Sequence, residues 1–364
     1  MEIKMDTIIR KIEEANINEE FILEAGNILK SGGLVAFPTE TVYGLGGNAL
    51  DSSASAKIYA AKGRPSDNPL IAHISDISEL DDLVSYIPEN AKKLIDAYWP
   101  GPLTMVFKKS EIVPYETTGG LETVAVRMPS HLIARKIIAA AGVPIAAPSA
   151  NTSGRPSPTI AAHVIEDMNG LIDMIVDGGK VGIGIESTIV DVTTEVPMIL
   201  RPGFITKKMI EQVIGDVSED KVVSAKDIKD VSDNGYVPKA PGMKYKHYAP
   251  KAELIMFEGK LDLVVDEINE QVQKYLGMDM KVGVIATDET KNRYNADYIV
   301  SIGSRADETT IANSLYEVLR NFDDTDVQVI LSESFYDDEL GCSIMNRLIK
   351  AAGYNLIKVG NDEI

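Results

Sequence analysis

Residues 34–46 read LVAFPTETVYGLG, and this stretch decides how the N-terminal part of the chain is interpreted. Leu34–Phe37 is a short apolar run typical of a buried strand, which Pro38 ends. We predict that a glycine-rich turn with hydroxyls and one carboxylate follows. Polar groups at a strand end, with glycines that allow close backbone approach, suit a small polar ligand. The alternative is a tight turn whose side chains satisfy one another.

The pattern around this stretch predicts an α/β domain with a mixed, twisted sheet. A helix over Asn18–Ser31 precedes it, capped by Asn18 and stopped by two glycines, and a second helix begins at Asp51 or Ser52 and ends near Gly63. Further strands are predicted at Leu70–Ile74, Leu103–Phe107, Thr123–Arg127, Pro144–Ala147, Met174–Val176, Ser187–Val192 and Met198–Leu200. Further helices are predicted at Pro88–Tyr98, Leu132–Ala141, Ile160–Met168 and Lys207–Ile214.

The pattern then changes to that of a linker. From about Asp216 to Pro250 the chain is polar and is interrupted by prolines. From Glu253 to Ala352, strands and helices alternate, which predicts a smaller, Rossmann-like parallel α/β domain. We therefore predict a catalytic domain over residues 1–215, a linker over 216–250 and a C-terminal domain over 251–364.

Composition excludes several classes of protein. The formal net charge of −19 argues against a general nucleic-acid binder, and the single cysteine excludes an internal disulfide framework and a cysteine-rich zinc site. No apolar run is long enough for a membrane span, and the N-terminus has no secretory signal, so we expect a cytoplasmic protein without a membrane partner. The P-loop, dinucleotide, metalloprotease and serine-hydrolase motifs are absent from the sequence.

Four basic or titratable positions are candidates for ligand binding. Lys62 and Arg64 flank a glycine at a helix end, where they suit phosphate or carboxylate or else cap the helix C-terminus. Arg127 ends a buried strand, where it can hold a carboxylate or form an internal salt bridge. His73 lies in a strand, where it is either a site residue or a satisfied core residue.

Polar segments at the ends of other predicted elements extend this set. Residues 147–159 read APSANTSGRPSPT and offer hydroxyls and an amide, although Ser157 or Thr159 can equally cap the next helix. The segments ESTIVD at 186–191 and LRPG at 200–203 are weak signals alone. In the linker, PGMKYKHYAP at 241–250 combines cations with tyrosines, which suits a nucleotide or else an exposed linker.

Taken together and in this order, these segments resemble the threonylcarbamoyl-AMP synthase family, whose N-terminal domain is called YrdC-like. The motifs PTETVYGLG, KGRPSDNPL, TVAVRMP, APSANTSGRPSPT, ESTIVD and RPG carry the resemblance. The linker motif and GCSIMNRL at 341–348 resemble the long, two-domain form. The resemblance covers the whole chain.

The resemblance implies a nucleotidyltransferase that makes threonylcarbamoyl-AMP and pyrophosphate from L-threonine, bicarbonate or CO₂, and ATP with Mg²⁺. The product would feed the threonylcarbamoyladenosine modification of tRNA through a downstream threonylcarbamoyl transferase complex, with at most a weak contact to tRNA. By resemblance, L-threonine would be bound by Thr41, His73, Arg127 and Ser187. Lys62 and Arg64 would act in catalysis, and the ATP-binding set would be Arg64, Asn68, Thr123, Ala147, Ser149, Asn151, Ser157, Arg201, Tyr245 and His247, with no metal held by protein side chains alone.

The resemblance leaves open how the reaction is catalysed, and two functions without this chemistry are the alternatives. We expect catalysis by positioning and charge neutralisation, with residues 241–250 closing over the nucleotide as a lid. The alternatives are an RNA-binding module, supported by a basic cluster of Lys57, Lys62 and Arg64, and a nucleotide-sensing module without this chemistry.

Overall fold

The stretch at residues 34–46 forms two paired strands. β2 (Val35–Pro38) and β3 (Tyr43–Asn48) are antiparallel, with Val35 opposite Gly46 and Pro38 opposite Tyr43. The expected glycine-rich turn is therefore wrong beyond residue 42, because the glycines lie within a strand. A Cβ at Gly46 would come within 2.6 Å of the Phe37 ring, so glycine is what allows this close packing.

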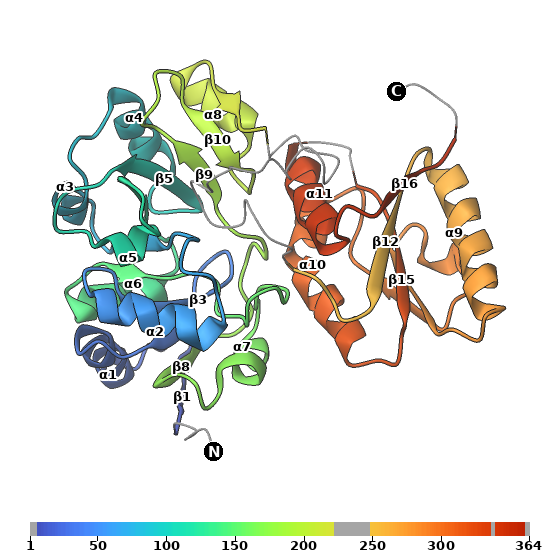
Figure 1. Ribbon diagram of the computed structural model, residues 1–364, viewed down its shortest axis with the longest axis horizontal. Helices are drawn as coiled ribbons and strands as arrows, with labels where there is room; N and C mark the ends of the chain where they lie inside the picture. The colour runs from blue at the N-terminus through green and yellow to red at the C-terminus, as the bar shows by residue number, and fades with distance from the viewer. Residues whose placement is uncertain (1–5, 222–247, 336–338, 361–364) are drawn as a thin grey trace. The chain divides into compact units, whose positions relative to one another are not determined.

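The computed structural model describes residues 6–221, 248–335 and 339–360, which fall into two compact units. The first contains residues 6–153 and 157–221, and the second contains residues 154–156, 248–335 and 339–360. Figure 1 labels many of their helices and strands.

The first unit is built on one mixed sheet whose strand order is β1-β8-β2-β3-β7-β4-β6-β5-β9-β10-β11. Its remaining strands are β1 (Ile8–Lys11), β4 (Ile71–His73), β5 (Leu103–Lys108), β6 (Thr123–Arg127), β7 (Ile145–Ala146), β8 (Met174–Asp177), β9 (Thr188–Asp191), β10 (Met198–Arg201) and β11 (Ser218–Glu219). Its helices are α1 (Glu19–Lys30), α2 (Ser52–Lys62), α3 (Leu80–Leu83), α4 (Glu89–Tyr98), α5 (Tyr115–Thr118), α6 (Leu132–Ala141), α7 (Ala161–Met168) and α8 (Lys207–Ile214), with a 3₁₀ turn at Ile77–Glu79.

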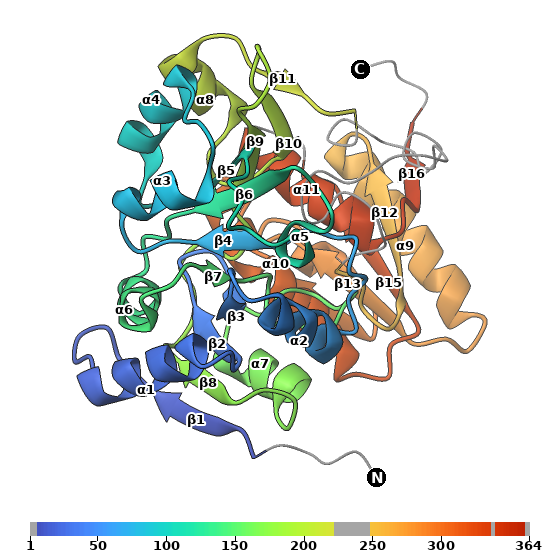
Figure 2. The same cartoon turned by 60° about the vertical axis from the view of Figure 1, so that its left-hand side comes forward.

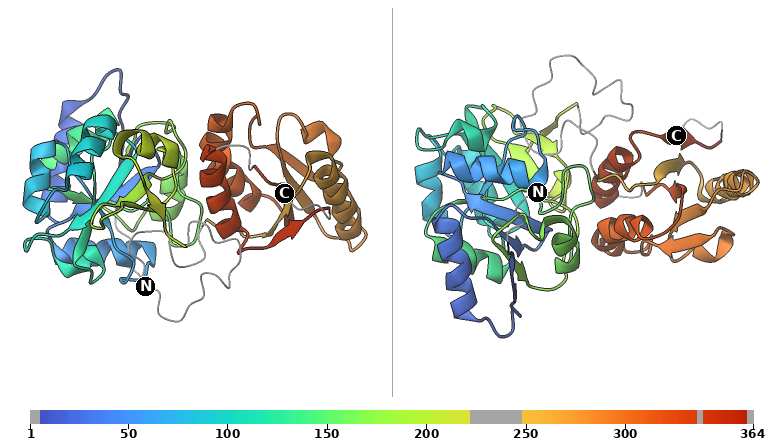
Figure 3. Two further views of the ribbon diagram at one scale, coloured as in Figure 1. Left: turned by 90° about the horizontal axis from the view of Figure 1, so that it is seen from above. Right: turned by 60° about the horizontal axis from the view of Figure 1, so that its bottom comes forward.

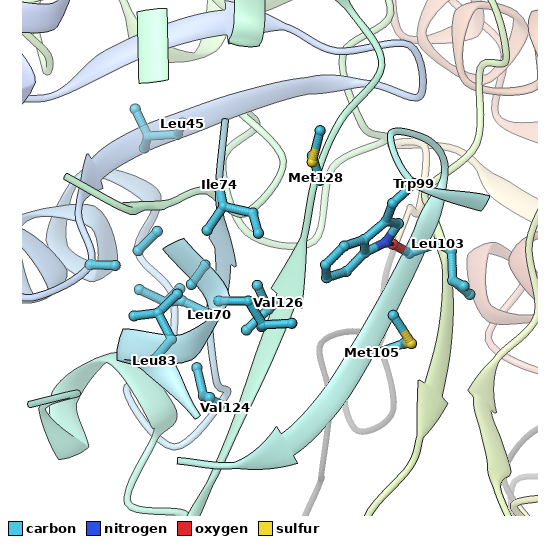
Figure 4. Packing of buried hydrophobic residues seen from close by; sticks show 14 of the residues in the cluster. Leu45, Leu70, Ile74, Leu83, Trp99, Leu103, Met105, Val124, Val126 and Met128 are labelled. Carbon is cyan, nitrogen blue, oxygen red and sulfur yellow. Dashed lines mark hydrogen bonds between the residues drawn. The ribbon is translucent and has the colours of Figure 1, made fainter. Parts of the chain in front are cut away.

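Both faces of this sheet are covered, which explains the unbroken apolar run of β2. Leu34 and Ala36 belong to one apolar cluster, whereas Val35 and Phe37 belong to another. The first cluster includes side chains of α2, α4, α7 and α8, and the second includes side chains of α1 and α6. Figure 2 shows the strands between these helices, and Figure 4 shows part of the first cluster around Trp99 and Val126.

The second unit has a five-stranded parallel sheet in the order β14-β13-β15-β12-β16. Its strands are β12 (Glu253–Glu258), β13 (Val282–Ala286), β14 (Tyr298–Ser301), β15 (Val329–Glu333) and β16 (Leu356–Lys358), and its helices are α9 (Leu261–Leu276), α10 (Glu308–Asp323) and α11 (Glu339–Ala351). α9 covers one face, and α10 and α11 pack together on the other (Figures 1 and 3).

The fold class predicted from the sequence is confirmed, with corrections to individual elements. Strands β1, β3, β11 and β16 and the short helices α3 and α5 were not predicted. The alternation in the second unit is also less regular than expected, because β13 and β14 are joined by a 3₁₀ turn (Lys291–Arg293) instead of a helix. The predicted boundaries of the domains stay a prediction, since most of residues 216–250 lies outside the described residues.

Candidate active site

Arg127 is a deeply buried cation of the candidate site. It ends β6, and only 4% of its surface is exposed. Its Nε donates to the carbonyl of Gly101 at 3.3 Å and its Nη1 donates to Oγ1 of Thr41 at 2.9 Å. Its Nη2 lies 2.7 Å from Oε1 of Glu40. The loop before β3 therefore supplies both a hydroxyl and a carboxylate to this guanidinium.

His73 stands opposite Arg127 on the neighbouring strand β4. It is buried, and its Nδ1 lies 3.0 Å from the carbonyl of Ile71. Burial, together with the nearby Arg127 charge, lowers the pKa of His73 to about 3. The imidazole is therefore neutral at physiological pH and adds no second positive charge beside Arg127.

A row of polar groups continues across the sheet from Arg127. Thr104 of β5 lies opposite Arg127, and its Oγ1 is 2.8 Å from Oγ of Ser187, the residue before β9. Arg201, at the end of β10, donates from Nε to the carbonyl of Ser187 at 3.1 Å and from Nη2 to its Oγ at 3.2 Å. Because β4, β6, β5, β9 and β10 are consecutive in the sheet, four of the predicted residues lie along one row.

Lys62 holds the polar loop that follows β7. Its Nζ donates to the carbonyls of Ser149 and Asn151, both at 2.5 Å, and it is 1% exposed. Oγ of Ser149 donates to Oδ1 of Asn151 at 2.5 Å. Helix α2 is capped by Gly63 in the left-handed conformation, so the side chain of Lys62 is not used as a helix cap. The three predicted residues therefore form one cluster.

Arg64 and Asn68, which follow Lys62 in the chain, contact each other and offer a further candidate ligand contact. Arg64 is half-buried and donates to the carbonyls of Asn68 and Pro69 at 3.4 and 3.3 Å. Oδ1 of Asn68 is buried and has no hydrogen-bond partner. An unsatisfied buried amide oxygen is costly unless a ligand supplies the donor, so it marks a candidate contact.

The backbone connects the Thr41 loop to the Ser149 loop. Tyr43 donates to the carbonyl of Pro158 at 2.9 Å, and Ala150 donates to the carbonyl of Tyr43 at 2.8 Å. Ala147 donates its own N–H to Ile71 at 2.9 Å, so only its carbonyl is left for a ligand. The two loops are therefore neighbours within the first unit.

Ser157 has a different partner from the one that the helix-cap alternative requires. Its Oγ donates to Oε1 of Glu186 at 2.6 Å, and α7 has Ile160 at its N-cap position without a side-chain cap. This contact ties the loop at 147–159 to the segment that carries Ser187.

Thr123 is not brought to these clusters, and two other predicted residues cannot be compared with them. Thr123 opens β6, four residues before Arg127, and so lies about 13 Å from it along the strand. Tyr245 and His247 lie outside the described residues. A cavity of about 800 Å³ lined by Asn27, Lys57, Leu171 and Asp173, among others, contains none of the predicted site residues.

The basic cluster that supported an RNA-binding alternative is not exposed as a whole, because Lys57 is exposed but Lys62 is not. Lys62 is buried, and Lys57 donates to the carbonyl of Gly32 at 2.6 Å. These contacts direct both ammonium groups to backbone oxygens of the protein, which removes the main support for that alternative.

Sequence reasoning assigned no role to three polar residues that the structure places in the site. Glu40 lies inside the opening motif, Thr104 is a hydroxyl within an apolar strand, and Glu186 begins a quoted motif. A polar residue in an otherwise buried segment was the available signal for each, because burial of such a group demands a partner.

The described part of the chain contains neither a cluster of metal-ligand side chains nor a helix that could cross a membrane. Residues 6–221, 248–335 and 339–360 contain no group of three or more His, Cys, Asp or Glu side chains placed as metal ligands. None of the helices in these ranges has the length and apolar character that crossing a membrane requires.

Comparison with known proteins identifies the family. A family model described as "Telomere recombination" matches residues 27–203, and one described as "Threonylcarbamoyl-AMP synthase, C-terminal domain" matches residues 205–353. The threonylcarbamoyl-AMP synthase of Bacillus subtilis is 49% identical over 95% of this chain and 97% of its own length, and that of Pyrococcus abyssi is 50% identical over 97% and 100%. A crystal structure of P. abyssi Sua5 complexed with L-threonine matches with a TM-score of 0.90 at 49% identity, over 97% of this chain and 100% of that one. The chain belongs to the threonylcarbamoyl-AMP synthase family, in its two-domain form, and is an enzyme of the nucleotidyltransferase type.

Proposed function

We propose that this chain condenses L-threonine, bicarbonate and ATP into threonylcarbamoyl-AMP and pyrophosphate in the first unit. The observation that carries the proposal is a pair of buried cations, each of which contacts one of two neighbouring loops. Arg127 reaches Thr41, and Lys62 is clasped by the Ser149–Asn151 loop. One cation is suited to a carboxylate and the other lies beside the loop that would meet the phosphates.

The threonine half of the site would be formed by Arg127 and the residues around it. Nη2 of Arg127 is buried and makes no well-directed hydrogen bond, although it lies 2.7 Å from Oε1 of Glu40, so it can donate to the substrate carboxylate. Thr41 and Ser187 offer hydroxyls for the substrate hydroxyl, and His73 contributes a neutral ring. A charged histidine would compete for the carboxylate, and the low pKa of His73 prevents this.

The nucleotide half would be formed by Lys62, Arg64 and Arg201, which balance the charge of the phosphates. Asn68, with its unpaired Oδ1, would accept a hydrogen bond from the nucleotide. Further contacts in this proposal come from Thr123, Ala147, Ser149, Asn151, Ser157, Tyr245 and His247. Mg²⁺ would be bound by the phosphate oxygens of ATP, where it would reduce the charge on the departing pyrophosphate.

The proposed reaction depends on the positioning of its substrates, and it uses no nucleophile from the protein. The neutral amine of threonine and bicarbonate give the carbamate and water, and the carbamate oxygen attacks the α-phosphorus of ATP. The bond between the α-phosphorus and the bridging oxygen breaks, and pyrophosphate leaves with its electron pair. Holding the carbamate beside the α-phosphorus makes the second step effectively unimolecular, which accounts for much of the rate enhancement expected.

Pyrophosphate release tests this proposal directly. The full chain should release pyrophosphate when ATP, Mg²⁺, L-threonine and bicarbonate are all present, and omission of either threonine or bicarbonate should abolish the release. Threonine-independent release would contradict the proposal. A nucleotide-sensing or RNA-binding module would bind its ligand without turnover.

We also propose that the product is used for tRNA modification in the cytoplasm, where a transferase complex would consume it. Threonylcarbamoyl-AMP is a mixed anhydride, so its acyl group is activated for transfer to an amine. Transfer to tRNA in a coupled assay with a transferase complex would test this step.

A further inference from the structure

Glu40 is a buried carboxylate for which the reaction outlined above assigns no part. Its side chain is 13% exposed and lies in the loop between β2 and β3. The loop is held by backbone bonds from Ile183 to the carbonyl of Glu40 at 2.9 Å and from Gly184 to that of Thr41 at 3.1 Å. The position of Glu40 is therefore fixed by two segments of the first unit.

The pairing of Glu40 with Arg127 is incomplete. Oε1 of Glu40 lies 2.7 Å from Nη2 of Arg127, yet no N–H bond is well directed at either carboxylate oxygen. Nη2 of Arg127 also lacks a directed acceptor, whereas Nε and Nη1 donate to Gly101 and Thr41. A buried ion pair that served stability alone would be expected to satisfy its own donors and acceptors, because unsatisfied buried charges are costly.

The guanidinium and carboxylate groups of this pair are complementary to the two charges of a zwitterion. An α-amino acid carries a carboxylate and an ammonium group on the same carbon atom, and here a guanidinium nitrogen without a directed acceptor lies beside carboxylate oxygens without a directed donor. We propose that Glu40 receives the α-ammonium group of the amino-acid substrate while Arg127 receives its carboxylate, so that the pair selects α-amino acids over α-hydroxy acids. This inference rests on the proposed function, because it concerns the same substrate site.

The neighbouring titratable groups are compatible with this role. Burial lowers the pKa values of His73 and His131, which face Glu40, so neither supplies a competing cation at neutral pH. Burial would raise the pKa of Glu40, but the charge of Arg127 and nearby hydrogen-bond donors together outweigh this and leave the pKa below its usual value. Glu40 therefore accepts hydrogen bonds as an anion and does not keep the proton that the ammonium group must lose before carbamate formation.

Binding of two matched ligands tests the inference. L-Threonine and (2S,3R)-2,3-dihydroxybutanoate differ only in that a hydroxyl replaces the ammonium group. In calorimetry at neutral pH, the wild-type chain should bind threonine about 10- to 100-fold more tightly, the range of one charge-assisted contact. In Glu40→Gln this preference should fall to less than about 3-fold, and the affinity for ATP should not change.

Controls separate recognition of the ammonium group from a structural role. Glu14→Gln changes a half-exposed carboxylate that contacts His131 and the backbone of Leu132, and it should keep the full preference. If Glu40 only positions Arg127, Glu40→Gln will weaken both ligands equally, and the inference is overturned. Equal binding of the two ligands by the wild-type chain overturns it without any variant, which covers the case in which Glu40→Gln does not fold.

The same measurements distinguish the two proposals. A wild-type chain that neither binds threonine nor releases pyrophosphate contradicts the proposed function and this inference together. A chain that releases pyrophosphate but keeps the preference for threonine in Glu40→Gln contradicts this inference alone.

Discussion

At the scale of single residues, the candidate site is defined by polar groups whose burial requires partners. Arg127, Lys62 and Asn68 are each at most 4% exposed. Arg127 and Lys62 were selected from the sequence by their places at the end of a predicted strand and helix, and Asn68 was selected through the family resemblance. What could not be predicted was the pairing between them. Contacts such as that of Lys62 with Ser149 join residues 87 positions apart, and local pattern contains no information on such pairs.

Arg127→Lys tests the role of the guanidinium. Lysine keeps the positive charge beside Glu40, but it cannot present a second nitrogen to a carboxylate while it contacts Thr41. We expect the KM for threonine to rise about 10- to 100-fold, with the KM for ATP changed less than about 2-fold. Arg135→Lys, which alters a contact with the carbonyl of Ser75, is the control. An unchanged KM for threonine would contradict the assignment.

His73 should make the stability of the first unit dependent on pH. Because burial lowers its pKa in the folded state to about 3, the unfolded state binds a proton below its ordinary pKa of 6.5 and the folded state does not. Stability is therefore lost as pH falls from about 6.5 toward 3, and the loss between pH 7 and pH 5 should be about 2 kcal/mol. Denaturation of the wild-type chain and of His73→Asn at both pH values measures this difference. Equal pH dependence in the two proteins would show that the histidine is not held neutral.

At the scale of elements, the strands and helices with a clear apolar pattern were predicted from the sequence. Strands that are defined mainly by their pairing with neighbouring strands were missed. β2 was predicted because Leu34–Phe37 is apolar on both faces, and the structure gives each face its own cluster. β3 was missed because Gly44, Gly46 and Gly47 lower its strand propensity, and its pairing with β2 and β7 reveals it. The edge strand β11 was missed for a related reason, since its two residues pair with β10 without an apolar pattern of their own.

Gly203 shows how a motif glycine acts through an element. A Cβ at this position would lie 2.5 Å from the backbone nitrogen of Thr188, which cannot move without moving Ser187. We expect Gly203→Ala to destabilise the first unit by about 1–3 kcal/mol and to lower kcat/KM, because the contacts between Arg201 and Ser187 shift. Gly182→Ala is the matched control, since its nearest neighbour would be 4.0 Å away. Equal effects of the two substitutions on denaturation and kinetics would contradict this explanation.

At the scale of the whole molecule, two units with separate apolar cores follow one another along the chain. The change from a mixed pattern to strand–helix alternation was sufficient to predict this division. The roles of Tyr245 and His247 and the lid over residues 241–250 remain predictions, because they fall outside the described residues. The acidity of the chain had no bearing on the fold, and it argued only against a general nucleic-acid binder.

The second unit has its own buried polar centre, which makes the stability of the two units separately testable. Glu333 is fully buried and accepts hydrogen bonds from Tyr294 at 2.6 Å, from Thr290 and from Arg305. Glu333→Gln leaves the charge of Arg305 uncompensated, so we expect the second unit to lose about 3 kcal/mol.

Calorimetry of the full chain should then show two transitions, of which Glu333→Gln lowers one and saturating L-threonine raises the other. At 100 times its Kd, threonine should stabilise the first unit by about 2.7 kcal/mol, or about 5–10 °C in Tm, because every described residue proposed to bind it lies there. A single transition moved by both changes would show that the two units unfold together. A threonine-dependent shift in the transition that Glu333→Gln lowers would place the amino-acid site in the second unit.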